Sequence, residues 1–126
     1  MIRIPDPGRF ELRLMDGSAN PYLLQASVLA AGISGIKNKI DPGKPLDCNM
    51  YEDFAKYPNL PKLPDELDQS LKQLKQNKEM NDAFGADVIN SYIKLRSTEI
   101  KEFNNIERFD KSKPITKWER QNTLDC

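Results

Sequence analysis

The sequence lacks histidine altogether and has only two cysteines, Cys48 and Cys126. A chain without histidine cannot supply a histidine general base or a Ser–His–Asp triad of its own. Two cysteines are too few for a disulfide framework, and they lack the spacing of a zinc site. We therefore expect a reduced, cytoplasmic protein, in which any catalysis would use carboxylates, arginines or a metal.

An excess of charge of either sign is also missing, because 19 basic side chains balance 19 acidic ones. No overall field would attract the chain to nucleic acid or to anionic lipid. No stretch approaches the roughly 20 apolar residues of a membrane span, and the first residues lack the basic and then apolar pattern of a signal peptide. We expect neither a nucleic-acid-binding protein nor a secreted or membrane-inserted one.

What is present describes a small, rather polar chain. The 126 residues include 38% hydrophobic residues, 30% charged residues and nine prolines. This length allows one domain with one core. The composition is more open than that of a compact single-domain enzyme of the same size, which suggests that partners are missing.

The first predicted element is a strand at residues 9–14, where charged and apolar side chains alternate. A period of two places Arg9, Glu11 and Arg13 on one face of that strand. The turn-forming residues 5–8 precede it, so residues 2–4 form either an earlier strand or an extended entry. Arg3 comes close to the charged face only if this turn folds back.

A long helix is predicted next. Asn20 is a good N-cap and Pro21 suits the first helical position, and the apolar pattern continues to Ile40. Because this helix is apolar almost all round, we expect it to be buried on several sides, and the pair Gly32 and Gly35 suggests that another backbone packs against it.

The rest of the chain is predicted to be an irregular connection at residues 42–64 followed by two amphipathic helices. Leu67, Leu71 and Leu74 mark the first helix, a break follows near Gly85, and residues 87–106 form the second. The last 20 or so residues have no clear period, and we expect them to need docking to become ordered. The predicted fold class is thus α+β, with one or two short strands followed by about three helices. One or two strands cannot form a stable sheet alone, which indicates a piece of a larger domain.

The charged strand face is the main candidate for chemistry. An alternating charged strand is most often the solvated outer face of a sheet. Three arginines and no lysine are nevertheless more than solubility needs, because arginine offers planar forks that suit phosphate and carboxylate. The functional interpretation is a wall that binds anions and carries one metal-ligating carboxylate, made of Arg3, Arg9, Glu11 and Arg13.

Three blocks of the sequence closely resemble the end of the catalytic domain of glutamine synthetases. They are Arg-Phe-Glu-Leu-Arg-Leu at 9–14, Asp-Gly-Ser-Ala-Asn-Pro-Tyr-Leu at 16–23, and Ala-Ala-Gly-Ile-Ser-Gly-Ile-Lys-Asn-Lys-Ile-Asp-Pro-Gly-Lys-Pro at 30–45. Weaker similarity continues through Tyr-Ile-Lys-Leu-Arg at 92–96. Residues 118–126 are similar to the branch called type III, or glutamylamide-forming. The resemblance implies that residues 1–126 form the C-terminal segment of that catalytic domain, without its β-grasp domain and most of its sheet.

The resemblance also implies roles for the charged residues. Arg3 and Arg9 match arginines that face nucleotide phosphates, and Glu11 matches a glutamate that ligates a divalent ion, Mg or Mn. Arg13 matches the arginine that grips the carboxylate of the substrate glutamate. A lysine that some relatives carry just before the strand is absent here, where Pro7 and Gly8 stand.

The implied activity is an ATP-dependent glutamate–ammonia ligase of nitrogen metabolism that works through γ-glutamyl phosphate and assembles as a homo-oligomer. Since the other metal ligands lie upstream in the family, we expect this chain to be inactive alone, as the product of a truncated or split gene that begins at an internal methionine. Two alternatives remain: a γ-glutamylamide ligase that uses another amine, and a non-catalytic protein that binds full-length synthetases. Tyr51 falls where some relatives carry a regulatory nucleotidylated tyrosine, but the residues after it depart from their Leu-Pro pattern, which favours a plain loop residue.

Overall fold

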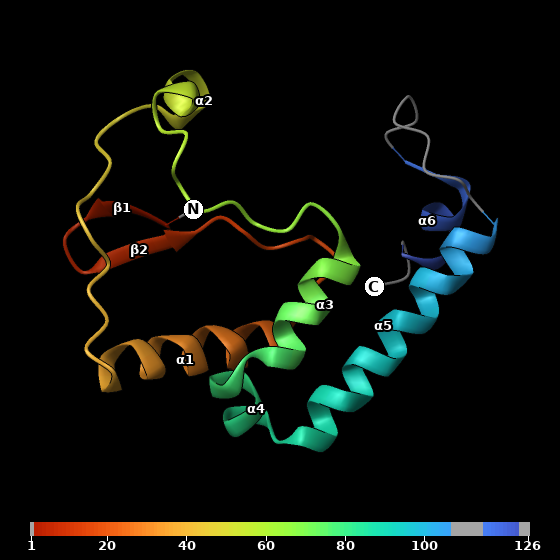
Figure 1. The fold of residues 1–126 in the computed structure, drawn as a ribbon. Helices are drawn as coiled ribbons and strands as arrows, with labels where there is room; N and C mark the ends of the chain where they lie inside the picture. The colour runs from red at the N-terminus through yellow and green to blue at the C-terminus, as the bar shows by residue number, and fades with distance from the viewer. Residues whose placement is uncertain (1, 107–114, 124–126) are drawn as a thin grey trace.

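The computed structural model describes residues 2–106 and 115–123. Two strands come first and helices follow, so the α+β class and the predicted order are confirmed. The strands lie at one side of the molecule and the longest helix lies at the other (Figure 1). The three predicted helices are present, and shorter helices that were not predicted lie between and after them.

The strands form an antiparallel hairpin. Strand β1 (Ile2–Asp6) pairs with β2 (Arg9–Leu12), and the register places Arg3 opposite Glu11. A two-residue turn joins them, and its second residue, Gly8, has φ of 79°, a left-handed conformation that glycine adopts without steric cost. The strand predicted at residues 9–14 is thus confirmed with an earlier end, and the segment before it is a strand rather than an extended entry.

Helix α1 (Pro21–Lys37) begins where the sequence predicted and ends before Ile40. The side chain of Asn20 accepts hydrogen bonds from the backbone N–H groups of the first turn, which fixes the start of the helix. Contrary to expectation, no residue of α1 is buried. A Cβ atom built at Gly32 or Gly35 would meet nothing within 4 Å, so no other backbone among the described residues packs against them.

The apolar surface of α1 therefore stays open to solvent over much of its length. Tyr22, Leu29, Ile33 and Ile36 are all exposed. The physical reason for the difference is that apolar periodicity predicts which face needs cover but not whether the same chain provides it. Among the described residues, no helix combines the length and the apolar character that crossing a membrane requires.

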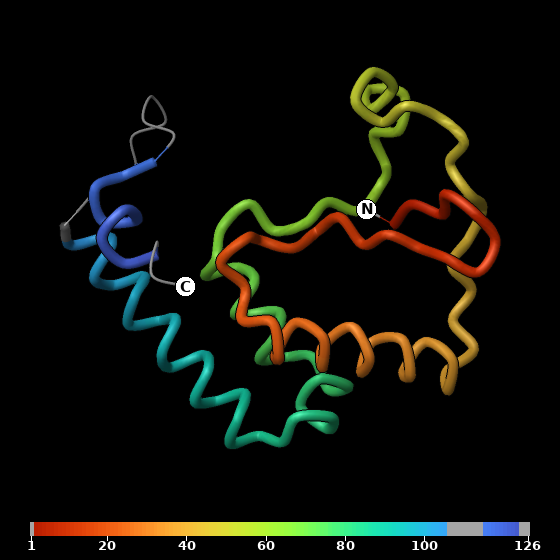
Figure 2. Tube along the Cα trace, turned by 180° about the vertical axis from the view of Figure 1, so that it is seen from behind, coloured from red at the N-terminus to blue at the C-terminus, as the bar shows by residue number. Residues whose placement is uncertain are grey.

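The connection after α1 is mostly irregular, as predicted, but it contains one short helical unit. The remaining helices are α2 (Met50–Asp53), the 3-10 helix η1 (Phe54–Lys56), α3 (Leu67–Gln76), α4 (Lys78–Phe84), α5 (Ala86–Ile106) and α6 (Lys117–Asn122). Gly85, at φ of 82°, ends α4 at the predicted break. Helix α4 packs against both α1 and α5, and α3 packs along α5. Figure 2 shows this helical group from behind.

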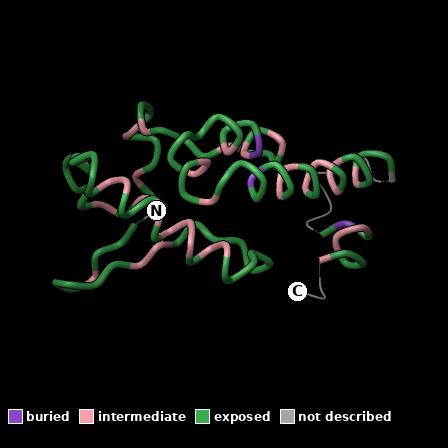
Figure 3. Tube along the Cα trace, turned by 90° about the horizontal axis from the view of Figure 1, so that it is seen from below, coloured by how far each residue is buried: buried purple, intermediate pink, exposed green. Residues whose placement is uncertain are grey.

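The core is very small. Leu71 of α3 and Ile89 of α5 are the buried hydrophobic residues in the described ranges, and most of the trace in Figure 3 is exposed or intermediate. Helix α6 docks on α5 through an edge-to-face contact between Trp118 and Phe103, whose ring centroids are 5.6 Å apart. The predicted docking of the tail is thus seen for residues 115–123, while residues 107–114 and 124–126 lie outside the described residues.

Candidate functional site

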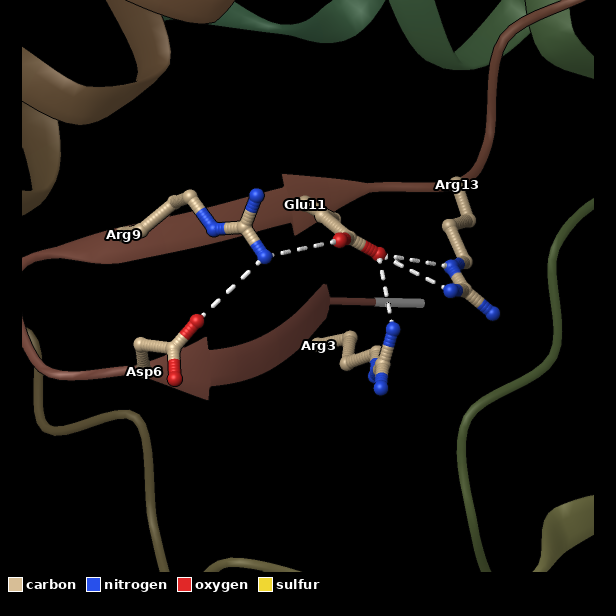
Figure 4. A network of polar contacts seen from close by, with 5 residues as sticks. All are labelled: Arg3, Asp6, Arg9, Glu11 and Arg13. Atoms are coloured by element: carbon tan, nitrogen blue, oxygen red, sulfur yellow. Dashed lines mark hydrogen bonds and ion pairs between the residues drawn. The ribbon is translucent and has the colours of Figure 1, made fainter.

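The hairpin brings all four predicted site residues together on one face. Arg9, Glu11 and Arg13 come from β2 and the residue after it, at a spacing of two, and the turn carries Arg3 back beside them (Figure 4). Register explains the meeting, because Arg3 is the partner of Glu11 across the ladder. We call these residues, together with Asp6, the arginine cluster.

Glu11 occupies the centre of the arginine cluster. Its Oε2 accepts hydrogen bonds from Arg13 Nη2 at 2.8 Å and Nε at 3.3 Å, and from Arg3 Nη1 at 3.4 Å. Its Oε1 lies 3.6 Å from Arg9 Nη2. One carboxylate thus holds three guanidinium groups that would otherwise repel one another.

Asp6 is a member of the arginine cluster that sequence reasoning did not find. Its Oδ2 lies 3.4 Å from Nη2 of Arg9, across the hairpin turn. The sequence places Asp6 among turn formers, and only the strand pairing Asp6–Arg9 shows that the two side chains share a face. Asp6 could have been predicted as a neighbour of Arg9 if residues 2–12 had been assigned as a hairpin.

The surrounding cations lower the pKa of Glu11. The hydrogen bond from Arg13 is the largest cause; desolvation comes next and opposes it, and the nearby charges of Arg3 and Arg13 together with the hydrogen bond from Arg3 lower the pKa further. Glu11 is therefore ionised throughout the neutral range. It is also the least exposed member of the trio on its strand, with a side chain that is 32% accessible.

The arginines keep hydrogen-bonding capacity for a ligand. Each guanidinium has five N–H donors. Two nitrogens of Arg13 and one nitrogen of Arg3 donate to Glu11, so the other donors remain unused there. The side chains of Arg3, Arg9 and Arg13 are 54–61% exposed. Exposed planar forks with unused donors can bind a phosphate or a carboxylate from solvent.

A divalent metal does not fit the described residues by themselves. No group of three or more His, Cys, Asp and Glu side chains that could hold an ion occurs in residues 2–106 and 115–123. Both oxygens of Glu11 face guanidinium groups, which would repel a cation. Glu11 can thus supply one ligand at most, and the rest of a metal site is not formed by these residues.

Tyr51 lies outside the hairpin that carries the arginine cluster. It is on the short helix α2, near its N-cap Asn49, and it is 94% exposed. In Figure 1, α2 stands apart from the hairpin. No hydrogen bond or ion pair among the described residues joins Tyr51 to the arginine cluster.

A family model described as "Glutamine synthetase, catalytic domain" matches residues 1–122, nearly the whole chain. The arginine cluster lies inside the matched region. No solved structure matches the chain significantly.

Curated relatives agree with the family match. Proteins named glutamine synthetase from Rhizobium meliloti (strain 1021) and Rhizobium leguminosarum bv. phaseoli are 43% and 40% identical over 125 residues, which is 99% of this chain and 27% of each relative. A glutamine synthetase from Nostoc sp. is 51% identical over 70 residues, or 48% of this chain and 15% of the relative. The chain thus spans about a quarter of the length of its first two relatives. With the arginine cluster inside the region they share, the chain belongs to the glutamine synthetase family.

Proposed function

We propose that this chain is the C-terminal segment of the catalytic domain of a cytoplasmic, ATP-dependent glutamate–ammonia ligase, and that it forms one wall of the active site. The observation that carries the proposal is the arginine cluster, in which three exposed guanidinium groups surround one ionised carboxylate. The named relatives support the ligase class. In the proposed enzyme, phosphate transfer from ATP to glutamate gives γ-glutamyl phosphate, which ammonia then attacks.

Arg3 and Arg9 would contact the phosphates of ATP, and Arg13 would bind the carboxylate of glutamate. Arg9 lies on the turn side of Glu11 and Arg13 on its other side, which supports different ligands for these two arginines, while Arg3 lies opposite Glu11 between them (Figure 4). Their charges would stabilise the negative charge of the transferred phosphoryl group, mainly through positioning and electrostatics.

Glu11 would act as one ligand of Mg or Mn, which in this class of ligase neutralises phosphate charge. The remaining ligands would come from chain outside the described residues, and Glu11 would exchange at least one guanidinium contact for the ion. It follows that the 126-residue chain turns over no ATP alone. The intact enzyme would be a homo-oligomer that contains the upstream part of the synthetase.

A reconstitution experiment tests the proposal. The purified chain is mixed with the Rhizobium meliloti synthetase from which the matching C-terminal quarter has been removed, and ATP turnover is followed with glutamate and ammonia. We expect turnover from the mixture only, with Arg13→Gln inactive and Glu79→Gln, an exposed change on α4, unaffected. Replacing ammonia with methylamine in the same assay identifies the acceptor. Turnover by the chain alone, or full activity of Arg13→Gln, would contradict the proposal.

A second candidate function is a non-catalytic subunit that binds a complete synthetase. The observation that favours it is the exposed apolar surface of α1, which offers Leu29, Ile33 and Ile36 to a partner. This candidate predicts stable co-purification with the full-length relative and no effect of Arg13→Gln. The ligase proposal predicts that the chain binds the shortened synthetase and not the complete one.

A further inference from the structure

A shallow groove with a basic rim lies between α3 and α5, away from the arginine cluster. Its volume is about 250 Å³, and Leu71, Ile93 and Ile100 form an apolar floor. Three lysines line its edge, Lys72 and Lys75 from α3 and Lys101 from α5. The residues from each helix recur at intervals of three and four, so the groove follows about two helical turns, or roughly 10 Å. We call it the lysine groove.

The charge of the lysine groove is not balanced within the described part of the chain. Asp68, the acidic residue of its lining, bonds to Lys72 at 3.0 Å. Lys75 and Lys101 are exposed, and their ammonium groups make no ion pair or hydrogen bond with a described residue. The groove therefore presents an apolar floor beside two uncompensated cations, which suits an acidic segment with an apolar or aromatic anchor.

The chain itself carries such a segment at residues 47–56, which we call the acidic knob. It contains α2 and η1, which pack on each other and stand out from the body in Figures 1 and 2. Asp47 and Glu52 are exposed and make no ion pair with a described residue, while Asp53 is bonded to Lys56 at 2.6 Å. Tyr51 beside them is almost fully exposed.

We propose that the acidic knob of one copy of this chain docks in the lysine groove of a second copy. Tyr51 would cover the apolar floor of the groove, and Asp47 and Glu52 would face Lys75 and Lys101. The knob of the same copy lies well away from its own groove (Figures 1 and 2), so the contact forms between copies. The two surfaces are different, so the association is head-to-tail and does not stop at a dimer unless a ring closes.

Charge reversal tests the proposal on the 126-residue chain. Sedimentation velocity over a wide concentration series measures the concentration at half-association. Lys75→Glu/Lys101→Glu should raise that concentration at least about tenfold, and Asp47→Lys/Glu52→Lys should do the same. Lys78→Glu/Lys94→Glu is the matched control, because both lysines are exposed and lie outside the groove. Thermal unfolding followed by circular dichroism confirms that each variant folds.

Mixing the two charge-reversed variants gives the sharper result. The acidic knob of the groove variant fits the basic groove of the knob variant, and the basic knob of the second variant fits the acidic groove of the first. We therefore expect the mixture to associate as the original chain does, and either variant alone to associate weakly. Combining all four substitutions in one chain should restore the association. The proposal is overturned if the chain is monomeric at every concentration, or if it associates equally in all variants, as nonspecific contact through α1 would produce.

Discussion

Replacing Glu11 with glutamine removes the negative charge at the centre of the arginine cluster and keeps the size of the side chain. In the structure, Glu11 accepts hydrogen bonds from Arg3 and Arg13 and forms an ion pair with Arg9. Without that charge, the three guanidinium groups are held less strongly, although Arg9 still pairs with Asp6, and their N–H donors become more available to a ligand. We therefore expect Glu11→Gln to bind tripolyphosphate more tightly than the original chain when no metal is present.

The magnitude follows from the distances in the arginine cluster. A phosphate bound to the guanidinium groups would lie about 5 Å from the Glu11 carboxylate, where repulsion in water changes affinity about fourfold per unit charge. Physiological salt reduces this to about twofold. Because only the nearest phosphate group lies this close, we expect a gain of about twofold at physiological salt that rises towards about fourfold at low salt.

Isothermal titration calorimetry with tripolyphosphate in the presence of EDTA measures the effect. Glu79→Gln makes the same chemical change on exposed α4 and should leave the affinity unchanged. Arg13→Gln should weaken binding instead. If Glu11→Gln binds tripolyphosphate no better than Glu79→Gln, the arginine cluster is a solvated strand face rather than an anion site.

Three further predictions concern stability. Leu71→Ala should lower the free energy of unfolding by about 2–3 kcal/mol, because Leu71 is only 6% exposed. Leu95 is 56% exposed, so Leu95→Ala should lower it by less than about 1 kcal/mol. Urea titration followed by circular dichroism measures both losses, and equal losses would contradict the assigned core. Gly8→Ala should weaken the hairpin by about 1 kcal/mol because of its positive φ, and NMR titration should then show the pKa of Glu11 returning towards its ordinary value. Folding lowers the pKa of Glu11, mainly through its hydrogen bond from Arg13, and the pKa of Asp16, mainly through the Ser18 hydroxyl. Their stabilising effect is therefore complete above the unfolded-state pKa values and is lost as the pH falls through the folded-state values. The urea concentration at half-unfolding should decrease once the pH is below about 4, and a concentration that stays constant into that range would refute the linkage.

The sequence predicted the charged face well because its information is local. A period of two in a strand places Arg9 and Glu11 on one side whatever the rest of the chain does. The position of Arg3 depended on whether residues 7 and 8 turned the chain back, and the sequence left that open. The strand register places Arg3 beside Glu11 in the arginine cluster, and it also places Asp6 beside Arg9, which was not predicted.

The sequence predicted less well wherever the answer depended on what covers an element. Apolar periodicity identified α1, but its predicted burial is not found among the described residues. Helix α6 was missed although a signal was present, because Thr116 and Glu119 form a capping box with both reciprocal hydrogen bonds. The predicted roles of the four site residues, by contrast, remain predictions, since geometry shows that they meet and not what they bind.

The hairpin also determines when the arginine cluster can form. The partners Arg3 and Glu11 are eight positions apart, so joining them requires closure of only a very short loop. Hairpins close in about 1–10 μs, well before helices distant in sequence, such as α1 and α4, can assemble. An isolated two-stranded hairpin is only marginally stable, so the cluster would form and dissolve repeatedly at first. A bound anion would prolong each such encounter, and the ligand could thus act as a template for the folding of its own site.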